Sequence, residues 1–380
     1  MRAFVVDEDA RPYSTSAHPR DIAGSVSIAC EREEGRPCGD GAGAFAEYDA
    51  AAGYDEVIVA GTRLRAVAGS GAYDPALAID RLFVRGAYGP LSAEVGRDVL
   101  VLGPAMRTRP TWSAHAAPID HVRGTIGIPH LRATWVIGRL GEPQTFEDNL
   151  VSVARLEGDV GGFQTGVTQL LQLGPGLGPV DFVLEHVRRG DASASATDTS
   201  NRRLGLDLVG WVNAARVYYG VVFEDWRDRF HHALRYDADH VLGIEHHRFL
   251  VEVQKTGVRS QEHTPRTTGF THRARGVGSP LGPDALAAYL EVRLPRVAPW
   301  IEYVQLSSDT YTFIVDGPIE HTTRGVDEER YRAGARATHP LRRDLRLDVS
   351  TFVERVTDFA FVEGDTRTNL GLSLAAVWIP

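Results

Sequence analysis

The sequence of 380 residues contains little cysteine, methionine or lysine: it has two Cys and two Met, and Lys255 is its only lysine. So few cysteines exclude a fold built on a framework of disulfides. Cationic residues are not in excess, because 41 Lys and Arg stand against 50 Asp and Glu and give a formal net charge of -9. A nucleic-acid partner is therefore not expected, since binding to phosphates usually needs a basic face.

Long apolar runs are also absent. The chain has no stretch of about 18 consecutive apolar residues, which excludes helical membrane proteins. Its 43% hydrophobic and 24% charged residues exclude disordered and collagen-like chains. A transmembrane β-barrel stays open, because its strands place lipid-facing residues only at every second position and look polar on average.

What the sequence does contain is alternation with a period of two residues. In the segment 91–102, LSAEVGRDVLVL, apolar residues fall on one face of a strand, while Ser92, Glu94 and Asp98 fall on the other. The segment 369–380, NLGLSLAAVWIP, repeats the pattern with leucines and a tryptophan on one face. A soluble β-sandwich would show the same local alternation, so this pattern alone does not choose between the two folds.

The connections between the alternating segments are more informative. We predict about 18 strands, at 21–30, 42–52, 54–68, 77–88, 91–102, 122–128, 131–139, 148–157, 161–171, 201–211, 214–224, 236–246, 248–257, 284–294, 299–316, 341–350, 352–362 and 368–379. Connections after even-numbered strands are tight, and those after odd-numbered strands are mostly long. This asymmetry is typical of outer-membrane barrels. We therefore predict an all-β fold, a transmembrane antiparallel β-barrel with long external loops and short periplasmic turns.

The N-terminal residues set the expected boundaries. The start, MRAFVVDEDARPYS, lacks the apolar run of about 7 to 15 residues that a secretory signal has. Taken alone, this favours the cytoplasm, whereas the strand pattern favours an outer-membrane protein whose export signal has been removed. We expect residues 1–20 to be an N-terminal periplasmic segment and residues 21–380 to be the barrel. Cys30 and Cys38 are either two unrelated thiols or a short-loop disulfide.

Catalytic motifs are missing. The chain contains no G-x-S-x-G, H-E-x-x-H, C-x-x-C or P-loop sequence. The paired histidines His231–His232 and His246–His247 do not predict a metal site, because neighbouring residues on a strand point to opposite faces. We predict no enzymatic activity, no cofactor and no metal.

Charged residues on the polar faces of the strands leave two interpretations. Among them are Glu94, Asp98, Asp207, Asp239, Glu245, Glu291, Arg293 and Arg346. These side chains either line a conduit or pair with one another and close the lumen, since buried charges require partners.

Two segments resemble a known family. The first, VGRDVLVLGPAMRTRPTWSAHAAPIDHVR, contributes Gly96, Arg97, Gly103, Pro104, Ser113, Ala116 and Pro118. The second, EHTPRTTGFTHRARGVGSPLGPDALAAYLEVRL, contributes Gly269, His272, Arg273, Arg275, Gly278, Pro280, Leu281, Gly282, Pro283, Asp284 and Ala285. Together they resemble the Wzi-type capsule-assembly family of outer-membrane proteins. Val101 and Leu102 stand where that family has aromatic residues, and Ala114 and His115 stand where it has two asparagines.

The resemblance implies an 18-stranded outer-membrane barrel that retains capsular or other surface polysaccharide as a lectin, without catalysis. The family's typical member has a periplasmic helical region before the barrel, which we expect to be missing or reduced here. Two other functions remain open: an outer-membrane porin or transport channel, and an outer-membrane enzyme acting on lipid or glycan. The expected partners are surface polysaccharide and outer-membrane lipid, and the barrel is expected to be a monomer.

Both family motifs fall in predicted external loops, 103–121 and 258–283. The candidate polysaccharide-binding residues there are Arg107, Arg109, Trp112, His115, His272, Arg273 and Arg275. Their charged and aromatic side chains suit a weak, repeated contact with an anionic glycan. The alternative is that Arg273 and Arg275 fold inward and pair with a lumen carboxylate such as Glu291, which would make the loop a plug.

Overall fold

The computed structural model describes residues 2–3, 21–27, 43–54, 58–69, 76–107, 109–112, 118–141, 150–173, 201–224, 238–258, 260, 271–272, 275–279, 281–313, 319–323, 325–343 and 345–378. No helix in these ranges is long and apolar enough to cross a membrane. The predicted N-terminal segment 1–20 lies almost wholly outside the described residues, and so do both cysteines.

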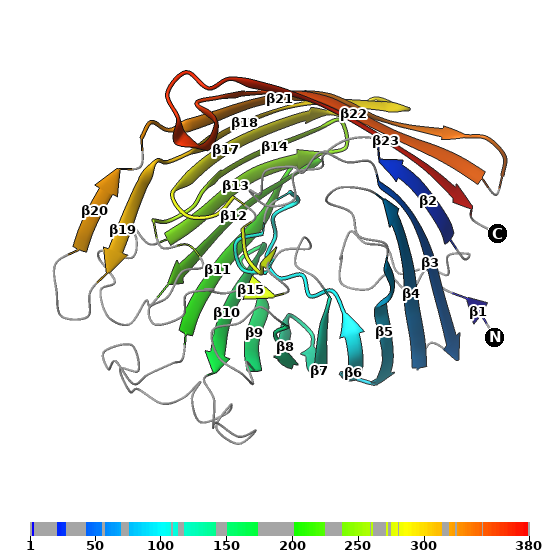
Figure 1. The fold of residues 1–380 in the computed structure, drawn as a ribbon. Coiled ribbons are helices and arrows are strands. Elements are labelled where there is room, and N and C mark those ends of the chain that lie inside the picture. The colour runs from blue at the N-terminus through cyan, green and yellow to red at the C-terminus, as the bar shows by residue number, and fades with distance from the viewer. Residues whose placement is uncertain are drawn as a thin grey trace.

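One large antiparallel sheet closes on itself into a ring (Figure 1). All of its 19 strands except the two-residue β1 (Arg2–Ala3), which pairs with β3, belong to the ring. The first half of the ring is β2 (Asp21–Ser27), β3 (Gly43–Tyr54), β4 (Ile58–Gly69), β5 (Ala76–Tyr88), β6 (Leu91–Asp98), β7 (Ile119–Ile128), β8 (Leu131–Arg139), β9 (Leu150–Val160) and β10 (Phe163–Leu173). The second half is β11 (Asn201–Val212), β12 (Ala215–Glu224), β13 (Ala238–His246), β14 (Phe249–Lys255), β17 (Ala285–Val292), β18 (Val297–Leu306), β21 (Glu328–Pro340), β22 (Leu345–Thr357) and β23 (Arg367–Trp378). Strand β2 pairs with β23, which closes a barrel of 18 strands and confirms the predicted fold.

Three smaller elements lie outside the ring. The hairpin of β15 (Thr271–His272) and β16 (Arg275–Gly276) lies in the connection between β14 and β17. The hairpin of β19 (Asp309–Phe313) and β20 (Ile319–Thr323) lies between β18 and β21. The short 3-10 helix η2 (Phe359–Phe361) follows β22. In Figure 1, β15 lies within the outline of the ring, whereas β19 and β20 extend from its rim.

The connections alternate in length around the ring. One end carries tight turns at 89–90, 129–130, 161–162, 213–214, 247–248, 293–296 and 341–344, and the other end carries long connections such as 99–118, 174–200, 256–284 and 307–327. The turn at Gly161–Gly162 needs glycine, because both residues have positive φ, +59° and +84°. We call the two ends the short-turn side and the long-loop side.

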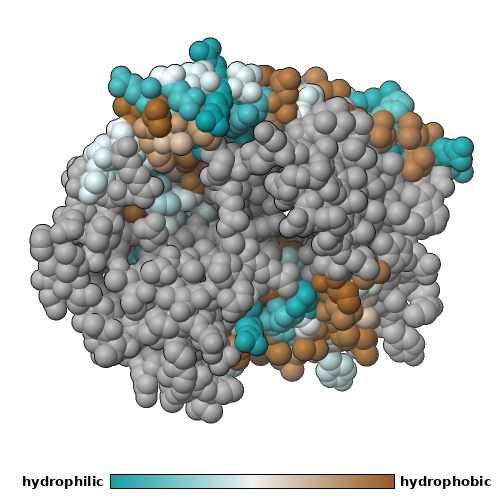
Figure 2. Space-filling view, in the orientation of Figure 1, coloured by the Kyte–Doolittle hydropathy of each residue, from teal (hydrophilic) through white to brown (hydrophobic). Residues whose placement is uncertain are grey.

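The outer wall of the barrel is apolar. On β7, every second residue from Asp120 to Ile128 is exposed, whereas His121 between them is buried. Large apolar side chains exposed on this outer wall include Leu82, Val84, Val95, Val122, Ile126, Leu156, Val167, Leu206, Leu242, Val253, Leu290, Ile301 and Val353. Figure 2 shows such hydrophobic residues along the outer edges of the ring. Exposed apolar side chains in this number fit a wall that faces hydrocarbon rather than water.

One part of the predicted strand ladder was wrong. We expected a loop over 317–340 and a tight turn at Ser350–Thr351, but β21 occupies Glu328–Pro340 and residues 350–351 lie in the middle of β22. The outward positions of β21 at residues 333, 335 and 337 are alanines, so this strand carries little of the hydrophobic alternation on which the prediction depended. The number of strands in the ring still matches the prediction, because β21 adds one strand and β22 joins two predicted strands into one.

Candidate functional site

The inward-facing charges of the barrel are paired along its wall. Glu94 on β6 accepts hydrogen bonds from Arg123 on β7, at 2.8 Å, and from Arg85 on β5. The Nε2 atom of His121 lies 2.9 Å from the other oxygen of Glu94. The Glu94 carboxylate is thus surrounded by donors from both neighbouring strands, which offsets the cost of burying its charge.

Further pairs continue around the wall. Arg155 on β9 reaches Asp207 on β11, at 2.7 Å, across the intervening strand β10. The strand between them carries Gly166 at this point, where a Cβ would lie 2.5 Å from the Arg155 guanidinium. Other ion pairs on the inner wall join Arg81 to Asp98, Arg203 to Asp239 and Glu224, Arg332 to Glu302 and Glu354, and Arg330 to Glu328. The inner-face charges in the described parts of the wall therefore pair mainly between neighbouring or next-but-one strands.

The connection between β6 and β7 turns into the barrel. Its described residues 99–107 and 109–112, which we call the plug segment, form a hairpin-like bridge in which the Leu102 amide donates to the Trp112 carbonyl oxygen at 3.1 Å. Leu100, Leu102 and Trp112 are buried in one apolar cluster with residues of the barrel wall. The wall residues of this cluster are Ile119, Val136, Val151, Val153 and Leu170. In Figure 1 the cyan trace of this connection runs within the ring.

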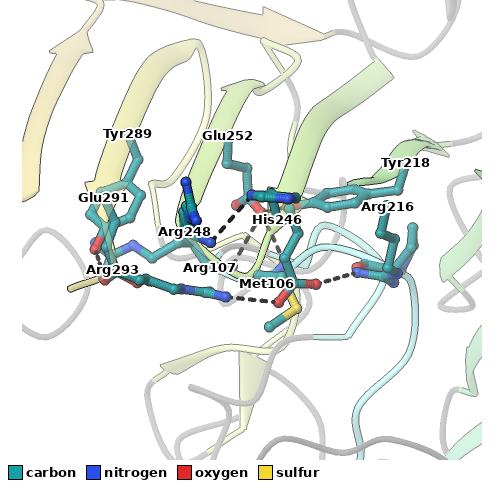
Figure 3. A network of polar contacts seen from close by, with 12 residues as sticks. Met106, Arg107, Arg216, Tyr218, His246, Arg248, Glu252, Tyr289, Glu291 and Arg293 are labelled. Atoms are coloured by element: carbon teal, nitrogen blue, oxygen red, sulfur yellow. Dashed lines mark hydrogen bonds and ion pairs between the residues drawn. The ribbon is translucent and has the colours of Figure 1, made fainter. Parts of the chain in front are cut away.

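Glu252 on β14 holds the next part of the plug segment. One of its carboxylate oxygens, Oε2, accepts the backbone N–H of Met106 at 2.8 Å and that of Arg107 at 3.2 Å. The same oxygen accepts the Tyr218 hydroxyl at 2.5 Å. Ala105 packs beside these groups against the wall. Because hydrogen bonds to a charged acceptor are stronger than neutral ones, Glu252 fastens the plug segment to β12 and β14 (Figure 3).

Arg107 fastens the plug segment on its other side. Its guanidinium forms an ion pair with Glu302 on β18 at 2.6 Å and lies 4.1 Å from the centre of the Tyr289 ring. Burial alone would lower the pKa of Arg107, but the Glu302 carboxylate outweighs it and raises the pKa above its ordinary value. The ion pair with Glu302 therefore stabilises the charged form of Arg107.

A third group of contacts lies toward the short-turn side (Figure 3). Arg216 on β12 donates to the Pro104 carbonyl oxygen of the plug segment at 2.8 Å and pairs with Glu245 on β13. Glu245 also pairs with Arg293 at 3.2 Å, and Arg293 pairs with Glu291 at 2.9 Å. The plug segment is therefore tied to a continuous row of charges that runs from β12 to the end of β17.

The two motif loops meet inside the barrel. Val277, from the connection between β14 and β17, belongs to the apolar cluster of Trp112. At the next residue, Gly278, a Cβ would lie 2.6 Å from the carbonyl oxygen of Pro110 in the plug segment. Only a residue without a side chain allows this approach. The two sequence motifs thus contact each other within the lumen.

The structure describes the side chains of three candidate polysaccharide-binding residues, Arg107, Arg109 and Trp112. Trp112 is fully buried, Arg109 is 9% exposed, and Arg107 is held by Glu302 and Tyr289. For His272 and Arg275 the structure describes only the backbone of β15 and β16, and His115 and Arg273 lie outside the described residues. In this structure the Trp112 ring offers no face to a ligand.

Sequence reasoning did not single out the residues that hold the plug segment. Glu252 stands on the charged face of the alternating segment 248–257, and this alternation places it inside the barrel, where it is buried. Its partners, however, are the backbone of residues more than 140 positions away. Tyr218 and Glu302 do not belong to any motif in the sequence. Within the described ranges, no group of three or more His, Cys, Asp or Glu side chains is placed as metal ligands would be.

Comparisons with known proteins identify the fold. No protein-family model and no curated protein sequence matches the chain. Its structure is similar to that of Wzi, an outer-membrane protein involved in group 1 capsule assembly in Escherichia coli and described as a carbohydrate-binding β-barrel. The TM-score is 0.66 at 11% identity, over 95% of this chain and 84% of Wzi.

Porins are also similar to this chain. OccD3 of Pseudomonas aeruginosa gives a TM-score of 0.52 at 9% identity, over 95% of this chain and 91% of OccD3. A BenF-like porin of Pseudomonas fluorescens gives 0.53 at 11% identity, over 95% of this chain and 97% of the porin. The fold is that of an outer-membrane β-barrel. It agrees with the outer-membrane location that we predicted from the sequence. Membership of the Wzi-type family stays a prediction.

Proposed function

We propose that this protein binds and retains capsular or other surface polysaccharide at the cell surface, as a non-catalytic outer-membrane barrel. The observation that carries the proposal is the plug segment. It is folded into the lumen and fastened by Glu252 and Arg107, so the barrel is built to be filled rather than to pass solutes freely. The similar fold of Wzi, which is described as carbohydrate-binding, supports this role.

The candidates of the plug segment have a different task in this proposal. Arg107, through its ion pair with Glu302, and the buried Trp112 hold the plug segment in place, and Arg109, which is 9% exposed, is also withdrawn from the glycan. The remaining candidates, His115, His272, Arg273 and Arg275, belong by sequence to the long connections between β6 and β7 and between β14 and β17, and they keep their proposed contact with polysaccharide. Short turns face the periplasm in outer-membrane barrels, so the long-loop side faces the cell exterior.

We infer no enzymatic role. The Glu94 carboxylate is engaged with Arg85, Arg123 and the His121 ring, and such pairing neutralises buried charge rather than activating a nucleophile. The proposed partners are surface polysaccharide and outer-membrane lipid, with no nucleic acid, and the proposed assembly is a single barrel.

The second candidate function is a porin or transport channel. It is favoured by inner-wall charges of β21 and β22 that keep contact with solvent: the side chains of Arg336, Arg346 and Asp348 are 49%, 44% and 32% exposed. Single-channel recording in planar bilayers separates the two functions. A steady, large conductance in the wild-type protein favours the channel, and a closed barrel favours polysaccharide retention.

Release of polysaccharide from cells tests the main proposal. In the bacterium that carries this chain, deletion of the gene is expected to move surface polysaccharide from the cells to the medium. The triple substitution His272→Ala, Arg273→Ala and Arg275→Ala is expected to do the same. A matched control removes two exposed arginines on the short-turn side, Arg342→Ala and Arg343→Ala, and is expected to retain polysaccharide. Unchanged retention after deletion of the gene would exclude the proposed function.

A further inference from the structure

Three aromatic side chains form a row on the inner wall of the barrel. Tyr289 on β17, Trp300 on β18 and Phe352 on β22 all occupy inward positions, as their register with the paired charges of the wall shows. The ring centres of Tyr289 and Trp300 are 5.9 Å apart, and those of Trp300 and Phe352 are 6.4 Å apart. The row therefore spans four adjacent strands, from β17 to β22.

Two glycines let these rings lie against the wall. A Cβ at Gly334, on the strand between Trp300 and Phe352, would lie 2.6 Å from the Trp300 ring. A Cβ at Gly371 on β23 would overlap the Phe352 ring in the same way. Each ring thus covers bare backbone of the next strand, with one face against the wall.

Covering a glycine does not by itself explain the exposure of this row. Phe83 covers Gly61 and Tyr218 covers Gly243 in the same manner, but these two rings are 3% and 1% exposed. Trp300 and Phe352 keep partial contact with solvent inside the barrel. The open surface of these two rings lies next to Tyr289, over which Arg107 of the plug segment lies.

Hydrogen-bonding groups border the open rings on both sides. Arg332 lies 5.4 Å from the centre of the Phe352 ring and pairs with Glu354 at 2.7 Å, while Asn369 donates to Glu354 at 2.6 Å. On the other side, Arg336 donates to the Tyr289 hydroxyl at 2.7 Å and pairs with Glu291. Flat apolar faces beside fixed donors and acceptors match a pyranose ring, which has an apolar C–H face and a rim of hydroxyls.

The charges of this region balance. The guanidinium groups of Arg107, Arg332 and Arg336 are paired with the carboxylates of Glu291, Glu302 and Glu354. A polyanion would meet as many carboxylates as guanidinium groups, so the row suits uncharged sugar units. Trp300 is the fourth residue of β18 from its short-turn end, and Phe352 is the eighth residue of β22 from the same end.

We propose that Trp300 and Phe352 form the stacking floor of an oligosaccharide-binding subsite inside the barrel, which takes neutral pyranose units of a glycan. The subsite rests on the proposed polysaccharide-binding function and adds a binding surface apart from the long loops. Paired Arg332–Glu354 and Arg336–Glu291 supply the hydrogen bonds to sugar hydroxyls.

Binding of maltoheptaose, a neutral oligosaccharide, to the full chain in detergent micelles tests the subsite. By isothermal titration calorimetry, we expect Trp300→Leu and Phe352→Leu each to weaken wild-type binding about tenfold, the size of one lost stacking contact. Hexagalacturonate, an acidic oligosaccharide, is expected to bind more weakly than maltoheptaose. The control Phe83→Leu removes a ring that covers a glycine in the same way but is buried, and it is expected to bind as the wild type does.

Heat-modifiable migration on gels shows which variants fold. If Trp300→Leu fails to fold, Trp300→Tyr keeps an aromatic face and is expected to retain binding. Equal affinity of the wild type and both leucine variants for maltoheptaose overturns the subsite. Loss of affinity in Phe83→Leu as large as in the other two variants also overturns it.

A parallel titration with surface polysaccharide purified from the source bacterium separates the two proposals. If the wild type and the double variant Trp300→Leu/Phe352→Leu bind both the polysaccharide and maltoheptaose equally, the proposed function stands and the subsite is overturned. If maltoheptaose binding depends on both rings but the polysaccharide is not bound, the subsite stands and the proposed function falls. If the wild type binds neither glycan, both are overturned.

Discussion

Replacement of Glu252 is expected to release the plug segment without unfolding the barrel. Three donors converge on a single oxygen of this side chain: the half-buried amides of Met106 and Arg107 and the buried hydroxyl of Tyr218. Glu252→Ala leaves all three without their acceptor, and each unsatisfied buried donor costs about 1–3 kcal/mol. Because water enters part of the space, we expect a total of about 3–5 kcal/mol, the range for breaking a buried charged network.

This cost falls on the contact between plug and wall. The backbone ladder of β14 with β13 and β17 does not use the Glu252 side chain, so the barrel itself is expected to stay closed. Glu252→Gln keeps the shape and one acceptor oxygen, and we expect it to cost about 1–2 kcal/mol. The plug segment should therefore detach often in the alanine variant and rarely in the glutamine variant.

Single-channel conductance measures the detachment. We expect Glu252→Ala to show frequent openings, Glu252→Gln to show few, and the wild type to show fewest, with the temperature of heat modification nearly unchanged. The matched control is Glu94→Gln, another buried inward carboxylate with several donors, all of which lie on β5 and β7. If Glu252→Ala conducts no more than Glu94→Gln, the plug segment is not held by Glu252 and the reasoning fails.

Three further outcomes are expected. Cysteine at position 363, on the long-loop side, should react with a membrane-impermeant label in intact cells, whereas cysteine at Ala214 in a tight turn should not; the reverse result would invert the orientation of the barrel. Leu242→Arg, on the outer wall near the middle of β13, should cost about 2–4 kcal/mol in urea unfolding if that wall meets hydrocarbon, and a cost near zero would contradict lipid contact. Hydrogen bonds from the Ser308 amide hold the pKa of Asp327 below its ordinary value of 3.8. Stability from this carboxylate is therefore present above about pH 4 and lost as the pH falls through the lower folded-state pKa, so the difference in heat-modification temperature between the wild type and Asp327→Ala should vanish at low pH. A difference that persists unchanged at low pH would show that the contact does not depend on charge.

The sequence alone determined most of the strands, because a strand with one apolar and one polar face must change character at every second residue. Segments such as 91–98 and 119–128 carry that alternation directly, and they became β6 and β7. The order of short and long connections then determined which end carries the turns. Strand β21 escaped detection because small alanines, which carry no strong signal, occupy several of its outward positions.

Only the tertiary structure decided which side chains of the plug segment are buried and which charges pair. Trp112 in a polar loop carries the same local signal whether it faces a glycan or an apolar cluster, and its burial depends on wall residues such as Leu170 from other strands. The partnership of Glu252 with the amides of Met106 and Arg107 spans about a third of the chain. Burial and ion pairing depend on which surfaces meet in space, and a local period of two residues holds no information on contacts between distant segments.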